Sequence, residues 1–184
     1  MFDWNRDGKV DPVDIDIWLG YDDDNDNNSP ITIDLNGHTF SFVQELEPKR
    51  NFWGKIKEFS PQAVLFKKDQ KPLHRFGLET FCRFSLNSSR YYGAKGVYAL
   101  LDETYLLYVG KTDNLAQRIN YDYGLISAKD CYLGSPETNC KINSLIRYKY
   151  QNGERTFLFF LETDNADVIE QDLVNSLRPP VNLI

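Results

Sequence analysis

The sequence predicts an α+β protein in which residues 96–184 fold in the order ββααβα. Runs of β-branched and aromatic residues between turn residues predict strands, and apolar residues repeating every three or four positions predict helices. The expected elements are strands at 96–101, 106–109 and 156–161, and helices at 113–121, 139–150 and from 164 or 165 to 177. We therefore expect a small three-stranded sheet, mixed or antiparallel, flanked by helices.

Turn and capping residues mark the ends of these elements. Asp102-Glu103-Thr104 joins the first two strands as a hairpin, and Asp113 can cap the first helix by accepting hydrogen bonds from its amides. Asn152-Gly153 turns the chain into the third strand. Pro179-Pro180 ends the last helix because proline has no amide hydrogen.

Charge divides the chain into three segments, although 184 residues suit one compact domain with additions. The net charge is −6, but residues 1–30 carry nine aspartates against two basic residues, and residues 31–95 carry eleven basic residues against six acids. We expect an acidic loop and linker at 1–30, a basic N-terminal extension packed on the core at 31–95, and the core at 96–184. Within the extension, alternation around Asn36-Gly37 predicts a further hairpin at 31–42.

The first fourteen residues place oxygen-bearing side chains at the spacing of a calcium-binding loop. The candidate ligands, at loop positions 1, 3, 5 and 12, are Asp3, Asn5, Asp7 and Asp14. Gly8 at position 6 permits the sharp turn that brings such side chains around a hard cation. The segment resembles an EF-hand or dockerin-type loop, which implies a Ca²⁺ site. A solvated acidic turn is the alternative.

The basic extension mixes cations with aromatic residues, a composition suited to phosphate contacts and to packing on bases or sugars. The candidate nucleic-acid-binding residues are Lys55, Lys57, Lys67, Lys68 and Arg75. Phe52 and Trp53 lie among them. A solvated face over an ordinary core is the alternative interpretation.

Composition indicates a soluble, cytoplasmic protein with no membrane partner. No stretch approaches the roughly 20 apolar residues that span a bilayer, and the N-terminus lacks the basic flank and apolar run of a signal peptide. Cys82, Cys131 and Cys140 have no metal-ligand spacing, so we expect reduced thiols, with a disulfide or a zinc site as alternatives.

Five residues of the C-terminal half form a set suited to phosphodiester hydrolysis. They are, in chain order, Tyr98, Tyr108, Arg118, Glu170 and Asn182. A carboxylate can hold a hard cation, an arginine can bind phosphate oxygens, and a tyrosine can relay a proton. The two histidines, His38 and His74, both precede this half, which excludes histidine-based hydrolysis within it.

Gly96-Val97-Tyr98 and Tyr108-Val109-Gly110 resemble the two strand motifs that name the GIY-YIG nucleases. The arginine ten residues after Tyr108, the glutamate of the last helix and the asparagine of the tail complete the set of that family. Together with Pro72-Leu73-His74-Arg75-Phe76-Gly77, they make residues 72–184 similar to small stand-alone bacterial members near the restriction-type branch.

The resemblance implies a restriction- or defence-like endonuclease that acts on double-stranded DNA with Mg²⁺ or Mn²⁺. Glu170 would hold the metal, since Mg²⁺ often takes only one or two carboxylates, and Arg118 would bind phosphate through its planar fork. Tyr98 would accept a proton from the attacking water, with its pKa lowered by Lys111 or the metal. Tyr108 would orient the water or the scissile phosphate.

Asn182 would hold the surroundings of Glu170 or contact phosphate. Some relatives carry a histidine one helical turn after the arginine, where this chain has Asp122, so Tyr121 or Tyr123 would have to take that auxiliary role. With one site per chain, cutting both strands would require a homodimer or two successive nicks.

Structural interpretations remain open for each residue alone. Tyr98 and Tyr108 would also suit a cross-strand aromatic pair, and Arg118 and Glu170 a salt bridge between helices. The alternatives for the whole chain are a module of GIY-YIG fold that binds DNA without cutting it, and a calcium-responsive interaction protein.

Overall fold

The computed structural model describes residues 31–64 and 72–183, and this part of the chain has an α+β fold. It contains a five-stranded antiparallel sheet and three α-helices, and none of its helices is long and apolar enough to cross a membrane. The described residues divide into two compact units. The sheet unit comprises residues 31–45, 94–113 and 157–183, and the α2 unit comprises residues 46–64, 72–93 and 114–156.

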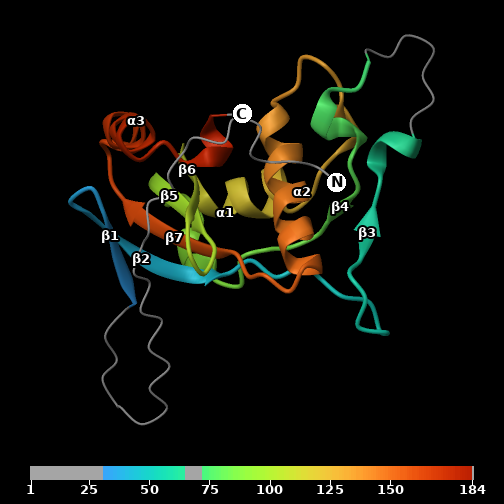
Figure 1. Cartoon of the computed structure of the whole chain (residues 1–184), viewed down its shortest axis with the longest axis horizontal. Helices are drawn as coiled ribbons and strands as arrows, with labels where there is room; N and C mark the ends of the chain where they lie inside the picture. The colour runs from blue at the N-terminus through green and yellow to red at the C-terminus, as the bar shows by residue number, and fades with distance from the viewer. Residues whose placement is uncertain (1–30, 65–71, 184) are drawn as a thin grey trace. The chain divides into compact units, whose positions relative to one another are not determined.

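The sheet unit holds all five strands of the main sheet (Figure 1). These are β1 (Thr32–Leu35), β2 (His38–Glu45), β5 (Gly96–Leu101), β6 (Leu106–Thr112) and β7 (Phe157–Glu162). Their order is β1-β2-β7-β5-β6, and every neighbouring pair is antiparallel. The expectation of three strands is therefore wrong, as is the mixed alternative, because the hairpin before residue 46 adds two antiparallel strands, of which β2 pairs with β7.

That hairpin confirms the prediction made from Asn36-Gly37. Asn36 has φ of 53° and Gly37 of 82°, the two successive left-handed residues that a tight two-residue hairpin turn requires. The Gly37 amide also donates to Asp34 Oδ1 at 2.8 Å. The predicted hairpin around Asp102-Glu103-Thr104 is likewise confirmed by the pairing of β5 with β6.

The sheet and helix α3 (Ala166–Leu177) enclose the core of this unit (Figure 1). All five strands and α3 contribute buried side chains: Ile33, Leu35, Phe40, Val97, Ala99, Leu101, Leu106, Val109, Phe157, Phe159, Ala166 and Leu173. Because side chains alternate along a strand, Val97 and Ala99 face α3, whereas Tyr98 and Leu100 face the other way. Each large buried apolar side chain contributes about 1.5–3 kcal/mol, so this packing fixes the register of the sheet.

The α2 unit is built from short elements around one longer helix, α2 (Glu137–Gln151). The others are β3 (Glu58–Phe59), η1 (Pro61–Val64), η2 (Arg75–Leu78), β4 (Phe81–Cys82), η3 (Ser89–Tyr91), α1 (Leu115–Gln117), η4 (Arg118–Tyr123) and η5 (Ala128–Cys131). Helix α2 confirms the prediction at 139–150. In the sheet unit, the tail after α3 forms the short turn η6 (Pro180–Asn182).

The helix expected at 113–121 differs from the prediction in its cap and its geometry. Asn114, not Asp113, caps α1, because its Oδ1 accepts from the Gln117 amide at 3.0 Å. After one turn the helix widens, and Arg118–Tyr123 forms a π-helical turn. The Gly124 amide closes this turn on the Ile119 carbonyl at 2.8 Å, five residues back. Spacing of apolar residues cannot distinguish a single π turn from α-helix, which explains the difference.

His74 belongs to the scaffold of the α2 unit. Its Nδ1 accepts from the Gly77 amide at 3.0 Å, so Nε2 carries the proton and donates to the Asp130 carbonyl at 2.6 Å. Gly77 has no room for a side chain, since a Cβ there would lie 2.0 Å from the Cys131 carbonyl oxygen. The string from Pro72 to Gly77 therefore holds two loops together by close backbone contact.

The fully buried side-chain amide of Asn143 on α2 forms hydrogen bonds with β4 and with η4. Its Oδ1 accepts from the Cys82 amide at 2.9 Å, and its Nδ2 donates to the carbonyls of Cys82 at 2.8 Å and Tyr123 at 2.6 Å. We expect Asn143→Ala to lower the free energy of unfolding by about 3 kcal/mol, because it leaves buried backbone groups without partners. Urea denaturation measures the loss.

Asn139 provides the matched control, one helical turn earlier on α2. It is also buried, but its Oδ1 has no hydrogen-bond partner among the described residues. Asn139→Ala should therefore cost less than about 1 kcal/mol. Equal losses in the two variants would contradict the role given to the Asn143 hydrogen bonds.

Candidate active site

The two motif tyrosines lie side by side on one face of the sheet. Tyr98 on β5 and Tyr108 on β6 have ring centroids 6.1 Å apart with the planes inclined at 44°. Tyr98 is fully buried, whereas Tyr108 is only half-buried. Tyr98 pairs with Gly110 across the strands, and a Cβ at Gly110 would lie 2.5 Å from the Tyr98 hydroxyl oxygen. Glycine at position 110 therefore leaves room for the Tyr98 side chain beside β6.

Lys111, at the end of β6, binds two carboxylates of α3. Its Nζ contacts Asp167 Oδ1 directly and lies 3.3 Å from Glu170 Oε2. The hydrogen bond to Asp167, and then that to Glu170, raise the pKa of Lys111, while Lys111 lowers the pKa of Asp167. The ammonium and the Asp167 carboxylate thus stay charged throughout the neutral range. The Glu170 side chain is 24% exposed, against 81% for Asp167, so Glu170 is the more enclosed of the two acids.

Asp167 was not among the residues predicted from the sequence. Asp167 and Glu170 are three residues apart on a helix, which places their carboxylates on the same face, and this spacing was the signal that could have identified Asp167. Two carboxylates converging on one cation form a hard-oxygen donor set that also fits Mg²⁺, which commonly takes one or two protein carboxylates. No group of three or more His, Cys, Asp or Glu side chains suited to holding a metal occurs in residues 31–64 and 72–183.

Strand alternation separates these features into two groups within the sheet unit. Lys111 pairs with Val97 on the face covered by α3, whereas Tyr98 and Tyr108 face the opposite side. Both groups meet the same edge strand, because β6 carries Tyr108 and Lys111 and lies at one end of the strand order.

Asn182 binds the outer edge of that strand. Its Nδ2 donates to the Val109 carbonyl at 2.8 Å, and its Oδ1 accepts from the Val109 amide at 2.9 Å. Both polar atoms of the side chain are thus used on the backbone between Tyr108 and Gly110. This geometry makes Asn182 a positioning residue for β6. The expectation that it holds the surroundings of Glu170 or contacts phosphate stays a prediction.

Replacing Asn182 should loosen the edge of β6. We expect Asn182→Leu, of similar size, to increase hydrogen exchange of the Val109 amide at least tenfold and to lower stability by about 1–2 kcal/mol. Hydrogen-exchange mass spectrometry of the β6 peptide measures this. Asn175→Ala, at an exposed position of α3, is the control and should leave exchange in β6 unchanged. Unchanged exchange in the Asn182 variant would contradict the positioning role.

Arg118 begins the π-helical turn of the α2 unit. Its Nη1 donates to Asp122 Oδ2 at 3.1 Å, and its guanidinium carbon lies 5.3 Å from the centre of the Tyr123 ring. Asp122 therefore orients the guanidinium. Tyr123 is fully buried and Tyr121 is 56% exposed, so of these two tyrosines only Tyr121 reaches solvent.

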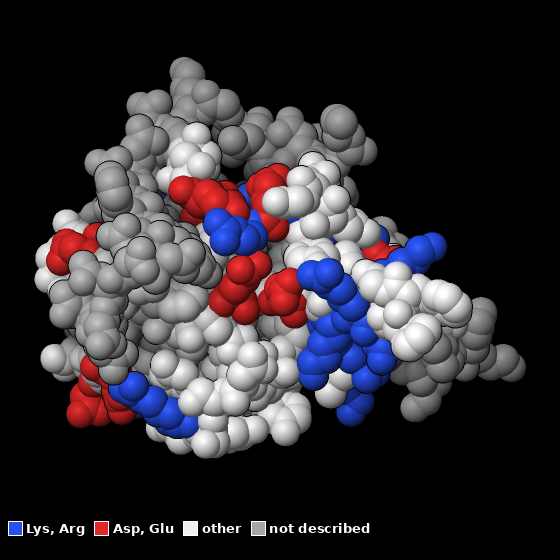
Figure 2. All heavy atoms as spheres, turned by 90° about the horizontal axis from the view of Figure 1, so that it is seen from below, with Lys and Arg blue, Asp and Glu red and all other residues white. Residues whose placement is uncertain are grey.

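Three of the expected nucleic-acid-binding residues, Lys55, Lys57 and Arg75, are exposed on the α2 unit. Lys67 and Lys68 lie outside the described residues, as do the expected calcium ligands Asp3, Asn5, Asp7 and Asp14. Figure 2 shows one group of several lysine and arginine side chains on the face that it draws, and further basic side chains elsewhere on that face.

The three cysteines are all buried free thiols. Cys131 and Cys140 lie with their Sγ atoms 4.0 Å apart, without a disulfide. Burial raises the pKa of Cys82 to about 12, so this thiol is protonated at neutral pH.

Comparisons of the chain with models of protein families, with curated proteins and with solved structures gave no match.

Proposed function

We propose that the protein is a metal-dependent DNA endonuclease of the GIY-YIG type. The observation that carries the proposal is a convergence on β6. Lys111 on β6 binds Glu170 on α3. Val109, the residue after Tyr108, is hydrogen-bonded through its backbone to the side chain of Asn182 in the tail. Glu170 lies 59 residues after Lys111, and Asn182 lies 73 residues after Val109. The motif resemblance points to both residues independently of these contacts.

The individual contacts support a division of labour in hydrolysis. Tyr108 is the better candidate to accept a proton from the attacking water, because it is partly accessible whereas Tyr98 is enclosed. Lys111 holds the Glu170 carboxylate in place through its ammonium. Arg118, oriented by Asp122, offers a permanently charged fork for phosphate oxygens. Tyr98 packs against Tyr108 and sets the direction of its ring.

Glu170, with Asp167 beside it, would hold the divalent metal. A bound Mg²⁺ or Mn²⁺ polarises phosphate oxygens and lowers the pKa of water. Within the sheet unit, Tyr108 would take a proton and Lys111 would keep Glu170 oriented. In the α2 unit, Arg118 would neutralise charge on a phosphate.

The test is incubation of the purified full chain with a panel of supercoiled plasmids in Mg²⁺, Mn²⁺ or EDTA. We expect nicked or linear DNA with either metal and none with EDTA. DNA binding without cleavage of any plasmid, or of branched duplexes, would contradict the nuclease and favour a non-cleaving DNA-binding module.

A further inference from the structure

Residues 49–57 form a short hairpin in the α2 unit, here named the 49–57 hairpin. Backbone hydrogen bonds join Lys57 to Lys49 at 2.8 Å and Asn51 to Lys55 at 2.7 Å, and Arg50 pairs with Ile56 between them. The loop at its tip is Phe52-Trp53-Gly54, and Gly54 has the left-handed φ of 76° that closes such a three-residue loop.

The tip carries two aromatic side chains that face solvent. Phe52 is 94% exposed and Trp53 80% exposed, and their rings meet edge to face with centroids 5.4 Å apart. Asn51 Oδ1 accepts from the amides of Trp53 at 2.9 Å and Lys55 at 3.0 Å, so the loop that presents the rings is itself ordered. Adjoining aromatic rings that are exposed and held in place are typical of interaction surfaces.

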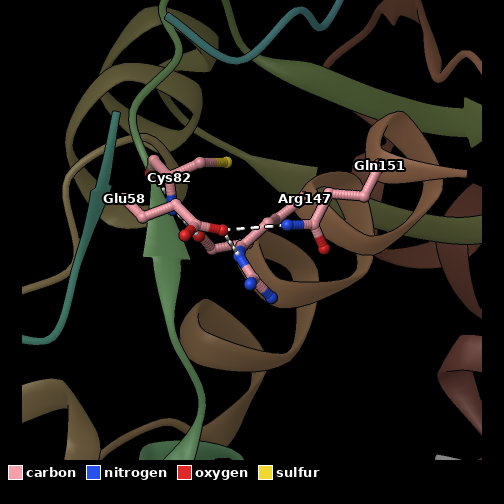
Figure 3. Close-up of polar contacts among 5 residues, drawn as sticks. Glu58, Cys82, Arg147 and Gln151 are labelled. Atoms are coloured by element: carbon pink, nitrogen blue, oxygen red, sulfur yellow. Dashed lines mark hydrogen bonds and ion pairs between the residues drawn. The ribbon is translucent and has the colours of Figure 1, made fainter. Parts of the chain in front are cut away.

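The base of the hairpin is fixed to helix α2. Glu58, the first residue of β3, accepts from Arg147 Nε at 2.6 Å and from Gln151 Nε2 at 2.9 Å, as Figure 3 shows. Arg50 lies 5.2 Å from the centre of the Tyr150 ring, on the same helix. The tip therefore extends from a rigid support, which lowers the entropy lost when the rings bind a partner.

The charges beside the rings define the chemistry of that partner. Residues 49–57 hold Lys49, Arg50, Lys55 and Lys57 and no acidic residue. Lys55 and Lys57 are exposed, and no ion pair to either is found in the described part of the chain. A polyanion with accessible aromatic faces complements both features, and unpaired nucleotides have both a phosphate backbone and open base faces. Paired bases within a duplex offer no such faces.

We propose that the 49–57 hairpin binds unpaired nucleotides of DNA, with Phe52 and Trp53 stacking on bases and Lys55 and Lys57 contacting phosphates. The choice of DNA rests on the proposed function. The hairpin would direct the nuclease to single-stranded, gapped or branched sites.

The test is fluorescence anisotropy of the full chain in EDTA, which prevents cleavage. Labelled probes are a 20-nucleotide single strand, the same sequence as a duplex, and that duplex with a three-nucleotide gap. Phe52→Ala/Trp53→Ala should weaken binding to the single strand and the gapped duplex about 10- to 100-fold, with less than a threefold change on the intact duplex. Both side chains are exposed, so the melting temperature should not change.

The charge on the hairpin is tested separately with Lys55→Ala/Lys57→Ala. This variant should weaken binding to all three probes and reduce the slope of log affinity against log salt by about 1.5–2. Lys129→Ala, at an exposed lysine elsewhere in the same unit, is the control and should leave the preference for gapped over intact duplex unchanged.

Three results would overturn the proposal. The first is unchanged affinity for the single strand in Phe52→Ala/Trp53→Ala, the ring variant. The second is an equal loss of affinity for the intact duplex and the single strand. The third is binding to phosphatidylserine vesicles that depends on the rings and exceeds binding to DNA.

Cleavage assays separate this proposal from the proposed nuclease activity. If the wild-type protein binds gapped DNA through the rings but never cuts it, only the nuclease proposal is refuted. If the ring variant cuts DNA with an unchanged preference for gapped sites, only the hairpin proposal is refuted.

Discussion

Glu170→Gln should lower the rate of DNA cleavage about 10³-fold, since it removes roughly 4 kcal/mol of transition-state stabilisation tied to a metal-binding carboxylate. Glutamine keeps the size of the side chain, so the packing of α3 on the sheet should be retained. The variant should also bind Mn²⁺ more weakly than wild type in isothermal titration. Plasmid cleavage at saturating Mn²⁺, with melting temperature as the folding check, measures the effect.

Asp172→Asn is the matched control on the same helix. Asp172 Oδ2 accepts from Asn36 Nδ2 at 2.9 Å at an exposed position, away from Lys111. We expect this variant to cleave at the wild-type rate. If Glu170→Gln retains half of the wild-type cleavage rate, Glu170 does not hold the metal. The same conclusion follows if Asp172→Asn loses as much of the cleavage rate as Glu170→Gln.

Local features of the fold were predictable from the sequence because short-range chemistry decides them. Asn36-Gly37 adopts the two left-handed conformations that its composition favours, and α2 and α3 lie close to where apolar spacing placed them. The pairing of β2 with β7 was not predictable in this way. Phe42 and Phe159 are opposite each other across more than a hundred residues of chain, and alternation identifies strands without identifying their partners.

The sequence indicates most of the candidate residues but not the contacts between them. The order of the tyrosines, Glu170 and Asn182 along the chain is a sequence property, whereas the bond from Asn182 to Val109 depends on how the tail meets an edge strand. The spacing of Asp167 from Glu170 is a weak signal, because acidic residues are common on solvated helix faces. The contact of Asp167 with the Lys111 ammonium exists only when α3 packs beside β6.

Tyr108→Phe should reduce cleavage about 10²-fold or more, because it removes the hydroxyl that we assign to proton transfer. Tyr98→Phe should reduce it less than tenfold, since its fully buried ring retains the packing against Tyr108. Each variant lacks one tyrosine hydroxyl, and the two hydroxyls belong to neighbouring strands. Comparing the two rates therefore tests whether the accessibility of the tyrosine to solvent decides its role. Single-turnover cleavage at several pH values measures both rates.

The pH dependence distinguishes a proton acceptor from a group that only positions substrate. A side chain that accepts a proton in the reaction makes the cleavage rate rise with pH, so Tyr108→Phe should lose that rise if the Tyr108 hydroxyl has this role. Tyr105→Phe, at a partly exposed tyrosine in the turn before β6, should keep both the rate and the pH profile of wild type. A Tyr98→Phe variant that loses the pH-dependent rise while Tyr108→Phe retains it would assign proton transfer to the buried tyrosine. The hydroxyl over Gly110 would then be the reacting group, and solvent would have to reach it by movement of the edge strand that Asn182 holds.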